Sequence, residues 1–373
     1  MRLLIFISSL SSGGAERVAA NLANHWASIG WQVTVVTLSD GTDDFYELSP
    51  SVQRFALGLL RESPNLFIGM ARNLRRVVTL RWVLHQTKPS IALAMMDKAN
   101  ILLAIAAYGL PHIVAIGSEH IHPPQMPLCR SWASLRRSAY SHLAAVTALT
   151  TESRDWLLRN TQVRKVAVIP NAVPWPLPKQ APLLTPQEFL PSDRKMLLAV
   201  GRLNKQKGFD LLIDAFVQLA GKHPIWDLVI LGEGSLRSLL VEKIKKAELE
   251  NRVFLTGRVG NVGDWYKAAD LYVLSSRFEG FGNSLAEALV YAVPSVSFDC
   301  DCGPRDIIRH GLDGLLVPNG DVMSLAEALD QLMSDATLRR RFSEKAIEAR
   351  ERFSVQKVTG MWESLFEELE LGK

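Results

Sequence analysis

Residues 3–38 read LLIFISSLSSGGAERVAANLANHWASIGWQVTVVTL and contain every part of a strand–helix–strand unit. The apolar run Leu3–Ser8 is typical of a buried strand, and Gly13-Gly14 follows it. A helical pattern then runs from Ala15 to Ile29 and ends at a glycine. Gln32–Leu38, rich in β-branched valine, predicts a second strand. Two strands joined through a helix in this way predict a parallel sheet covered by helices.

The same alternation extends in both directions along the chain, with one break. In the first half, short buried strands are expected at Ser90–Ala94, His112–Gly117, Ala144–Thr147 and Lys165–Ile169. Six prolines between Ala172 and Asp193 then oppose both helix and central strand, which predicts a linker. In the second half, strands are expected at Lys195–Val200, Asp227–Leu231, Arg252–Leu255, Leu271–Leu274 and Ser295–Phe298, and helices at Phe209–Ala220, Ser324–Met333 and Val355–Leu369.

The pattern therefore predicts an α/β protein with two Rossmann-like, doubly wound domains. We expect a first domain at residues 1–173, a proline-rich linker at 174–193 and a second domain at 194–354, with a C-terminal helix of about 355–373 completing the first domain. Folds of this class bind ligands at the carboxyl ends of their strands, so a ligand is expected in a central cleft that both domains face.

Composition excludes several classes of protein. The chain has 373 residues, of which 48% are hydrophobic and 21% charged, as in ordinary globular proteins. Three cysteines (Cys129, Cys300 and Cys302) are too few for a secreted disulfide scaffold. Neither a signal peptide nor a clean membrane span is apparent, so we expect a cytoplasmic protein.

Charge is unevenly distributed between the halves. Residues 1–190 hold 18 Lys and Arg against 11 Asp and Glu, a net +7, whereas residues 191–373 hold 24 against 27, a net −3. The excess is concentrated between Arg61 and Lys88, where Glu62 is the only acid and Arg72, Arg75 and Arg76 share a helical face. A second basic stretch is Leu128–Arg137. Each is either a solvated helix face or a basic amphipathic helix on an anionic membrane surface, and two such stretches favour the membrane. The acidic second half argues against a nucleic-acid partner.

Three glycine-containing loops that follow strands carry the candidate chemistry. Gly13 and Gly14 allow backbone amides to approach an anion, although the spacing lacks the dinucleotide fingerprint and a simple tight turn is the alternative. Residues 201–208, GRLNKQKG, place Arg202 and Lys207 where a diphosphate would bind, or else on an ordinary charged surface. Residues 277–287, RFEGFGNSLAE, bring two glutamates to a helix start, where they would contact sugar hydroxyls or merely cap the helix.

These motifs in this order resemble those of one family. The set comprises the loop at 13–17, the loop at 201–208, Gly232-Glu233-Gly234, the Glu279–Glu287 pair, Ile169-Pro170-Asn171 and Gly303-Pro304-Arg305-Asp306. The chain resembles retaining nucleotide-sugar glycosyltransferases of family 4, which have the GT-B fold, over essentially its whole length. It looks most similar to members that build bacterial cell-surface polysaccharides and lipid-linked oligosaccharides.

The resemblance implies roles for individual residues in binding a nucleotide-sugar donor. Arg202 and Lys207 match the pair that clamps the donor diphosphate, Glu279 the residue that touches the transferred sugar, and Glu287 the acceptor of ribose hydroxyl hydrogen bonds. The remaining donor-binding positions implied are Gly13, Gly14, Glu233, Phe281, Gly282, Asn283 and Ser284. The base would be held near Glu233 and residues 257–260. No metal or other cofactor is expected, and Asp299-Cys300-Asp301-Cys302 is poor metal-ligand geometry.

The resemblance also implies an acceptor side. His120 matches the histidine of the family's cleft, with His122 as the rival, and Asp97 ends a strand where it would contact the acceptor. A polyprenyl diphosphate-linked glycan would suit the basic helices, with Arg72, Arg75 and Arg76 contacting its diphosphate or anionic lipid. We therefore expect a peripheral protein on the inner face of the cell membrane.

The expected reaction is metal-independent transfer of a hexose or N-acetylhexosamine from a nucleotide sugar, with retention by front-face attack. The resemblance alone favours UDP over GDP as the nucleotide. Rival interpretations are a sugar-nucleotide epimerase or a glycan phosphorylase of related architecture, and a non-catalytic scaffold that binds nucleotide sugars. An epimerase would need no acceptor. A phosphorylase would need a pyridoxal phosphate lysine.

Overall fold

Two compact units make up the chain in a computed structural model, which describes residues 1–11, 13–60, 66–191 and 193–371. Unit 1 comprises Met1–Pro170 and Thr359–Lys373, and unit 2 comprises Asn171–Val358. Arg61 and Glu62 of the basic stretch lie outside the described residues.

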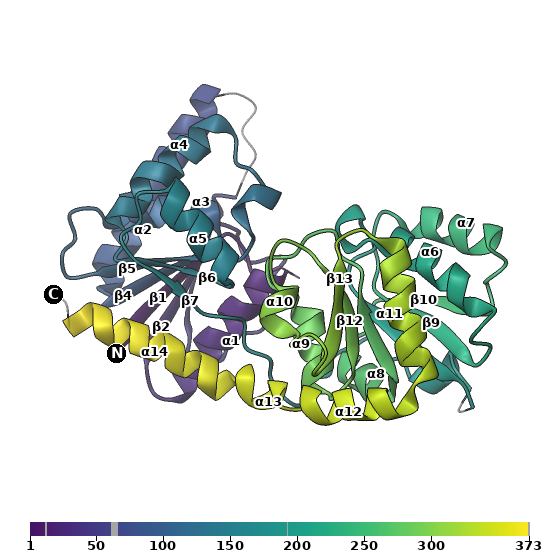
Figure 1. The fold of residues 1–373 in the computed structure, drawn as a ribbon. Helices are drawn as coiled ribbons and strands as arrows, with labels where there is room; N and C mark the ends of the chain where they lie inside the picture. Colours follow the sequence, from purple (N-terminus) through teal and green to yellow (C-terminus); the bar gives the residue numbers. More distant parts are fainter. Residues whose placement is uncertain (12, 61–65, 192, 372–373) are drawn as a thin grey trace. The chain divides into compact units, whose positions relative to one another are not determined.

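Unit 1 is built on a parallel sheet that, in the described part of the chain, has seven strands in the order β3-β2-β1-β4-β5-β6-β7. The strands are β1 (Arg2–Ile7), β2 (Gln32–Thr37), β3 (Gln53–Ala56), β4 (Ile91–Met95), β5 (Val114–Glu119), β6 (Ala145–Ala148) and β7 (Val166–Val168). The helices are α1 (Gly14–Ser28), α2 (Leu66–Thr87), α3 (Asp97–Ala107), α4 (Arg130–Ala139) and α5 (Thr151–Asn160), and they cover both faces of the sheet (Figure 1). This explains the uninterrupted apolar run of β1, where residues 3–7 are all buried.

Unit 2 repeats this architecture with a parallel sheet of six strands among the residues described, in the order β10-β9-β8-β11-β12-β13. The strands are β8 (Lys195–Val200), β9 (Trp226–Leu231), β10 (Val253–Gly257), β11 (Leu271–Leu274), β12 (Ser295–Asp299) and β13 (Gly314–Pro318). The helices are α6 (Phe209–Ala220), α7 (Arg237–Lys246), α8 (Val262–Ala268), α9 (Asn283–Val290), α10 (Pro304–Ile307), α11 (Val322–Ser334), α12 (Ala336–Ala346) and α13 (Ala349–Arg352). The α/β, doubly wound fold expected from the sequence is confirmed in both units.

The proline-rich segment at 174–193 is bonded to unit 2 along its length. The Leu177 amide donates to the Tyr291 hydroxyl (2.9 Å), and the Leu184 amide donates to Asn261 Oδ1 (3.1 Å). Asn261 Nδ2 returns a bond to the Leu184 carbonyl (3.0 Å). The segment therefore belongs to unit 2, and Pro186–Glu188 within it form a short 3-10 helix.

The last helix, α14 (Val355–Leu371), enters unit 1 at Thr359. There the rings of Trp362 and Phe366 pack against Trp26 of α1, at centroid distances of 6.5 and 5.4 Å. The Trp26 indole also donates to Glu363 Oε1 (3.1 Å). An aromatic cluster thereby anchors the end of the chain in unit 1.

Each sheet has one point at which the strand order reverses. In unit 1 this point lies between β1 and β4, and in unit 2 between β8 and β11. Ligands of open parallel sheets bind outside the carboxyl ends of the strands at such a point. The candidate ligand-binding residues are therefore those that follow these four strands.

Candidate active site

Glycines bring the loops of unit 2 into backbone contact beyond β8, β11 and β12. A Cβ atom on Gly208 would lie 2.1 Å from the carbonyl oxygen of Ser275, and one on Gly303 would lie 2.0 Å from that of Phe281. Both glycines also have positive φ angles, 62° and 101°. A side chain at either position would separate the loops, so the glycines fix the shape of the site.

Lys207 and Glu279 form an ion pair at the point where the strand order of this sheet reverses. The lysine Nζ lies 2.6 Å from Glu279 Oε1, and the Ser276 hydroxyl donates to the same oxygen at 2.6 Å. The two side chains are only 16% and 8% exposed. Hydrogen bonds thus join Lys207 to Ser276 and Glu279, which lie in a loop about 70 residues further along the chain. An ammonium group carries three donors, so Lys207 keeps two for a ligand.

Arg202 lies in the same loop as Lys207 and is exposed. Its backbone is fixed from both sides, because the Gly201 amide donates to the Leu231 carbonyl (3.0 Å) and the Leu203 amide to that of Glu233 (3.0 Å). Among the described residues its guanidinium has no hydrogen bond or ion pair. It is a charged group on a rigid loop, available to an anion.

Helix α9 begins directly beside this pair. Its N-cap, Gly282, has a φ of 103° and offers no side chain to the first turn. The amides of Asn283 and Ser284 find no acceptor within the described parts of the chain. The N-terminus of an eight-residue helix therefore presents unoccupied donors and a positive dipole end.

Two tyrosine hydroxyl groups hold side chains of α9 in place. The Tyr272 hydroxyl donates to Ser284 Oγ (2.8 Å), and the Tyr266 hydroxyl lies 3.1 Å from Glu287 Oε2. Glu287 is 6% exposed, and Phe281 is buried against Phe353 at a centroid distance of 5.6 Å. These contacts fix Glu287 as a buried carboxylate one turn beyond the helix start.

Glu233 follows β9 and lies near the end of β10. Its carboxylate pairs with Arg237 (3.1 Å), and Arg237 also donates to the Leu255 carbonyl (3.1 Å). A Cβ atom on Gly257 would lie 3.6 Å from Glu233 Oε2. The structure thus brings together Glu233 and the start of residues 257–260.

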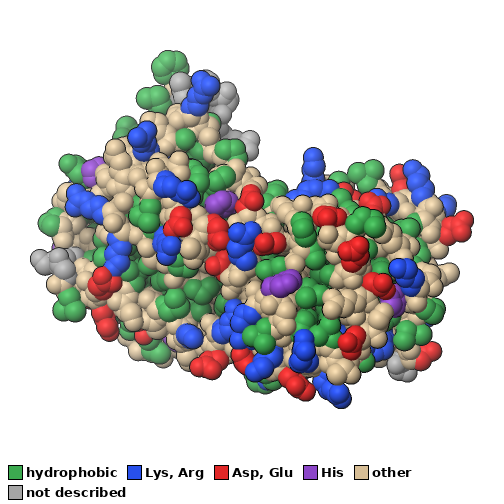
Figure 2. Space-filling view, viewed as in Figure 1, with side chains coloured by type: hydrophobic (Ala, Val, Ile, Leu, Met, Phe, Trp, Pro, Cys, Tyr) green, Lys and Arg blue, Asp and Glu red, His purple; other side chains and the backbone are tan. Residues whose placement is uncertain are grey.

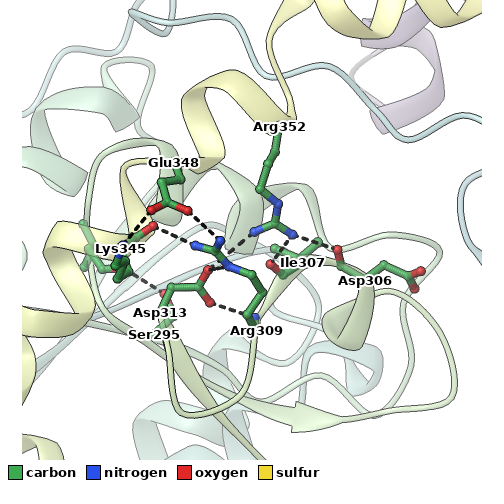
Figure 3. A network of polar contacts seen from close by, with 9 residues as sticks. Ser295, Asp306, Ile307, Arg309, Asp313, Lys345, Glu348 and Arg352 are labelled. Atoms are coloured by element: carbon green, nitrogen blue, oxygen red, sulfur yellow. Dashed lines mark hydrogen bonds and ion pairs between the residues drawn. The ribbon is translucent and has the colours of Figure 1, made fainter.

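Beyond β12, the loop that carries α10 is braced by a charged network (Figure 3). Asp313 is fully buried and accepts from Arg309 through the backbone amide (2.8 Å) and Nε (2.7 Å). Arg352 donates to the carbonyls of Asp306 (3.1 Å) and Ile307 (2.9 Å) at the end of α10. A cation at these carbonyls stabilises the end of the helix.

The Asp299–Cys302 segment lies at the end of β12. Arg305 pairs with Asp299 (2.9 Å), while Cys300 and Cys302 are buried. Within the described residues, no three His, Cys, Asp or Glu side chains lie close enough together to bind a metal ion.

In unit 1, Gly13 and Gly14 lie at the start of α1, after β1. A Cβ atom on Gly13 would lie 2.0 Å from the carboxylate of Glu16, the mobile end of a side chain that can move aside, so the geometry does not by itself require glycine here. His122, the rival of His120, is bonded through Nδ1 to the Ser153 hydroxyl (2.9 Å).

His120 is buried at the end of β5 and is fixed by a chain of hydroxyl groups. Thr147 Oγ1 donates to Ser118 Oγ (2.8 Å), which lies 3.0 Å from His120 Nε2. With Ser118 donating onward to Nε2, the ring proton lies on Nδ1, which has no partner among the described residues. Burial lowers the pKa of His120 to about 4, so the ring is neutral near pH 7 and presents one unused donor.

Two carboxyl groups lie near His120. Asp97 opens α3 after β4, with Oδ1 accepting from the Lys98 amide (2.6 Å). Glu119, which the sequence analysis did not select, is buried beside Asp97 and Arg136 and accepts a short hydrogen bond from the Tyr140 hydroxyl. Burial raises the pKa of Glu119 to about 7 despite that bond.

Helix α2 contains four arginines, and the three predicted to contact the acceptor or lipid differ in their surroundings. Arg76 donates through Nε and Nη2 to the Leu59 carbonyl (3.1 and 2.9 Å) and through Nη1 to Asn73 (2.8 Å). Its guanidinium is thus committed to the fold of unit 1. Arg72 is half-buried and Arg75 exposed. The helical face predicted from spacing therefore presents Arg75 most openly.

Two models of known protein families match this chain, one over most of unit 1 and one over most of unit 2. A model of glycosyltransferase family 4 matches residues 12–174, and a model of glycosyl transferases group 1 matches residues 182–349. The chain belongs to glycosyltransferase family 4. It is accordingly a glycosyltransferase, and this confirms the resemblance inferred from the motifs.

Relatives of this family 4 chain include enzymes of polysaccharide and lipid-linked glycan assembly. It is 27% identical to an alpha-1,4-N-acetyl-D-galactosaminyltransferase of Campylobacter jejuni, with 99% of both chains covered. It is 26% identical to the amylovoran biosynthesis glycosyltransferase AmsD of Erwinia amylovora, over 98% of this chain and 99% of that one. It is 34% identical to an exopolysaccharide phosphotransferase of Streptomyces coelicolor over 81% of this chain, which spans only 30% of that longer protein.

Solved structures show the same GT-B fold. Sucrose-phosphate synthase from Thermosynechococcus elongatus superposes with a TM-score of 0.81 at 19% identity, with 100% of both chains covered. Anabaena HepE, in complex with UDP and glucose, superposes with a TM-score of 0.78 at 20% identity and 99% coverage of both. The loops described above therefore follow the carboxyl ends of strands in a fold that this chain shares with these solved structures.

Proposed function

We propose that this glycosyltransferase moves a hexose or N-acetylhexosamine, with retention, from a UDP-linked donor to a polyprenyl diphosphate-linked glycan. One observation carries the proposal: exposed Arg202, the Lys207–Glu279 pair and the open N-terminus of α9 surround the strand-order reversal of unit 2. Two cations and a helix N-terminus on rigid loops suit the diphosphate of a sugar nucleotide.

The same groups fit the chemistry of bond cleavage. As the bond between the sugar C1 and the diphosphate breaks, negative charge grows on the leaving oxygen. Arg202 and Lys207 stabilise that charge in this proposal, without a metal ion. Glu279 holds Lys207 in place and faces the transferred sugar, while Glu287 accepts from the ribose and Glu233 contacts the base. For Gly13, Gly14 and His120, which belong to unit 1, the donor contacts that the resemblance implies stay predictions.

Retention follows from front-face attack in this proposal. The acceptor hydroxyl forms its bond to C1 on the face from which the diphosphate departs, and the hydroxyl proton passes to the leaving phosphate oxygen. Glu279 bonds to both Lys207 and Ser276, which suits a positioning carboxylate better than a nucleophile. A covalent glycosyl-enzyme in Glu279→Gln, or an inverted product, would contradict this mechanism.

The lipid-linked acceptor is inferred from two relatives, and contact with the membrane is inferred from the surface of α2. Two Campylobacter jejuni relatives, 27% identical over 99% and 92% of this chain, are named as N-acetylgalactosaminyltransferases acting on undecaprenol-linked diphospho-glycans. In this chain α2 exposes apolar residues spaced three or four apart, namely Phe67, Met70, Leu74, Val78 and Trp82. Figure 2 shows hydrophobic and basic side chains together at the upper left, the end of unit 1 where α2 begins in Figure 1.

An apolar stripe beside Arg72 and Arg75 suits an anionic membrane surface, with Asp97 near the acceptor glycan. None of the helices in the described ranges combines the length and apolarity needed to cross a membrane. We propose peripheral binding at the inner face of the cell membrane.

The test is a transfer assay with purified protein. UDP-linked hexoses and N-acetylhexosamines would be screened against polyprenyl diphosphate sugars, and the product's anomeric configuration determined by NMR. We expect one donor to give an acceptor-dependent product with the donor's anomeric configuration. Conversion of donor in the absence of acceptor would instead indicate an epimerase. Absence of any product with all donors would overturn the proposal.

A further inference from the structure

A cavity of about 410 Å³ lies within unit 1, at the carboxyl ends of β4 and β5. It is bounded by the start of α3, the segment that follows β5, and α4. Small-molecule sites commonly have volumes of roughly 300–1,000 Å³. Its place at the carboxyl edge of the sheet is where ligands of open α/β folds bind.

Glu119 is the strongest indication that this cavity takes a ligand. The residue is 4% exposed, and its Oε1 accepts from the Tyr140 hydroxyl. Its side chain lines the cavity, and within the described residues the carboxylate has no second hydrogen-bond partner. A buried carboxyl is normally hydrogen-bonded, so the second oxygen of Glu119 is open to hydrogen bonds from water or from a ligand in the cavity.

The backbone at the rim of the cavity is also strained. Met96 has a φ of 81° and a ψ of 152°, a conformation that residues with a side chain rarely adopt. It is held there by a bond from its own amide to the Ser118 carbonyl (2.9 Å) and one from the Asn100 amide (2.9 Å). Strain that the surroundings maintain in this way clusters at ligand sites.

The lining indicates which ligand fits. It contains two carboxyl groups, Asp97 and Glu119, and two cations, Lys98 and Arg136, so its net charge is small. The carboxyl groups disfavour a phosphate, while donors and acceptors together suit hydroxyl groups. The Trp132 ring, with Lys98 Nζ 6.0 Å from its centroid, adds an apolar surface for C–H groups. A neutral sugar presents both kinds of surface.

We propose that this cavity binds one neutral sugar ring, a hexose or N-acetylhexosamine, of the acceptor glycan. Asp97 and Glu119 accept from its hydroxyl groups, and Trp132 packs against its apolar face. The inference rests on the proposed function, because it gives the acceptor of that reaction a subsite.

The first test uses Cys129, which lines the cavity and is exposed, whereas Cys300 and Cys302 are buried. Alkylation by iodoacetamide at about pH 8 would be followed by mass spectrometry, with methyl α-glycosides of glucose, N-acetylglucosamine and N-acetylgalactosamine as probes. We expect at least one glycoside to slow alkylation of Cys129 severalfold. Trp132→Leu and Glu119→Gln should abolish this protection, because the first removes the apolar surface and the second replaces an accepting oxygen with an amide donor.

The control is Tyr108→Ser, at a cavity on the opposite, amino-terminal edge of the sheet, which should leave protection intact. Protection by inorganic phosphate alone, protection that survives Trp132→Leu, or no protection by any glycoside would overturn the proposal.

A kinetic test separates this inference from the proposed function. With the polyprenyl diphosphate acceptor, Trp132→Leu and Glu119→Gln should raise the acceptor KM about tenfold and leave the donor KM unchanged, whereas Tyr108→Ser changes neither. Transfer with an unchanged acceptor KM in both variants would overturn the subsite alone. Absence of transfer by the wild type, with Cys129 still protected, would overturn the proposed function alone.

Discussion

At the scale of single residues, Arg202 and Lys207 differ in a way that has functional consequences. Lys207 is already paired with Glu279 at 2.6 Å, whereas Arg202 has no partner among the described residues. A group that is free before the ligand arrives contributes its full charge–charge interaction on binding. We therefore expect Arg202 to contribute to donor affinity and Lys207 to contribute also to the stability of the loop.

Arg202→Ala should lower kcat/KM for transfer by about 10²–10³-fold, the usual effect of losing one fixed donor to developing charge. UDP binding, measured by calorimetry, should weaken in the same variant. Lys205→Ala is the matched control, because Lys205 is an exposed cation in the same loop. Equal effects of the two substitutions would show that only general positive charge matters.

Glu119 and His120 predict a pH dependence of stability. The pKa of Glu119 is raised by burial to about 7, so its favourable contribution is complete below its ordinary value of 4.5 and is lost as the pH rises through 7. The pKa of His120 is lowered by burial to about 4, so its contribution is complete above 6.5 and is lost as the pH falls towards 4. The two trends oppose each other between about pH 4.5 and 6.5, with Asp97, Arg136 and Tyr140 facing Glu119 throughout.

Glu119→Gln removes one of the two trends. The free energy of unfolding of the variant should therefore rise more steeply with pH than that of the wild type, by at most about 1.4 kcal/mol per pH unit. Urea denaturation at several pH values between about 5 and 7 measures the difference. Parallel curves for the two proteins would contradict the raised pKa.

For helices and strands, the sequence predicted the bounds correctly where the hydrophobic pattern was clear. Lys195–Val200, Phe209–Ala220 and Leu271–Leu274 match the observed elements to the residue. The strand expected at His112–Gly117 lies two residues later, as Val114–Glu119. β3 and β13 were missed, because β3 is a four-residue edge strand without a buried face and β13 ends in a proline.

In the candidate site, the sequence predicted single residues but not the contacts between them. Spacing and glycines singled out Arg202, Lys207, Glu279 and Glu287, whose loops do meet in unit 2. The Lys207–Glu279 pair itself joins residues 72 positions apart, and no local pattern specifies such a contact. Glu119 was missed because its significance comes from burial next to Tyr140 and a cavity, which only the packed structure reveals.

Helix α2 gives a prediction at this scale. Its exposed stripe includes Phe67, 81% exposed, and Leu74, 65% exposed. Phe67→Glu with Leu74→Glu should reduce binding to vesicles of anionic phospholipid at least tenfold in a sedimentation assay, because both apolar burial and charge attraction are lost. Leu239→Glu on α7, also an exposed leucine, is the control and should bind normally.

Arg75→Ala should weaken vesicle binding more than Arg76→Ala does, since Arg76 is bonded to Leu59. Unchanged binding by both the α2 double variant and Arg75→Ala would exclude this helix as the membrane contact.

At the scale of the whole molecule, one aromatic cluster fastens the C-terminal helix into unit 1. Trp26 is fully buried, stacks on Trp31 at 5.5 Å and contacts Trp362 and Phe366. Trp26→Ala should lower the free energy of unfolding by about 3–5 kcal/mol. Hydrogen exchange of residues 359–371 should accelerate, while exchange in α11 of unit 2 stays unchanged. Unaltered exchange at 359–371 would show that other contacts hold the helix.

Capture of a sugar nucleotide's diphosphate by unit 2 is the step on which the proposed reaction depends. The most direct measurement is a crystal structure of the protein with bound UDP. We predict that Arg202 and Lys207 each lie about 2.8 Å from phosphate oxygens, with the amides of Asn283 and Ser284 directed at the same group. UDP bound elsewhere, or an empty site with both side chains directed into solvent, would contradict the account.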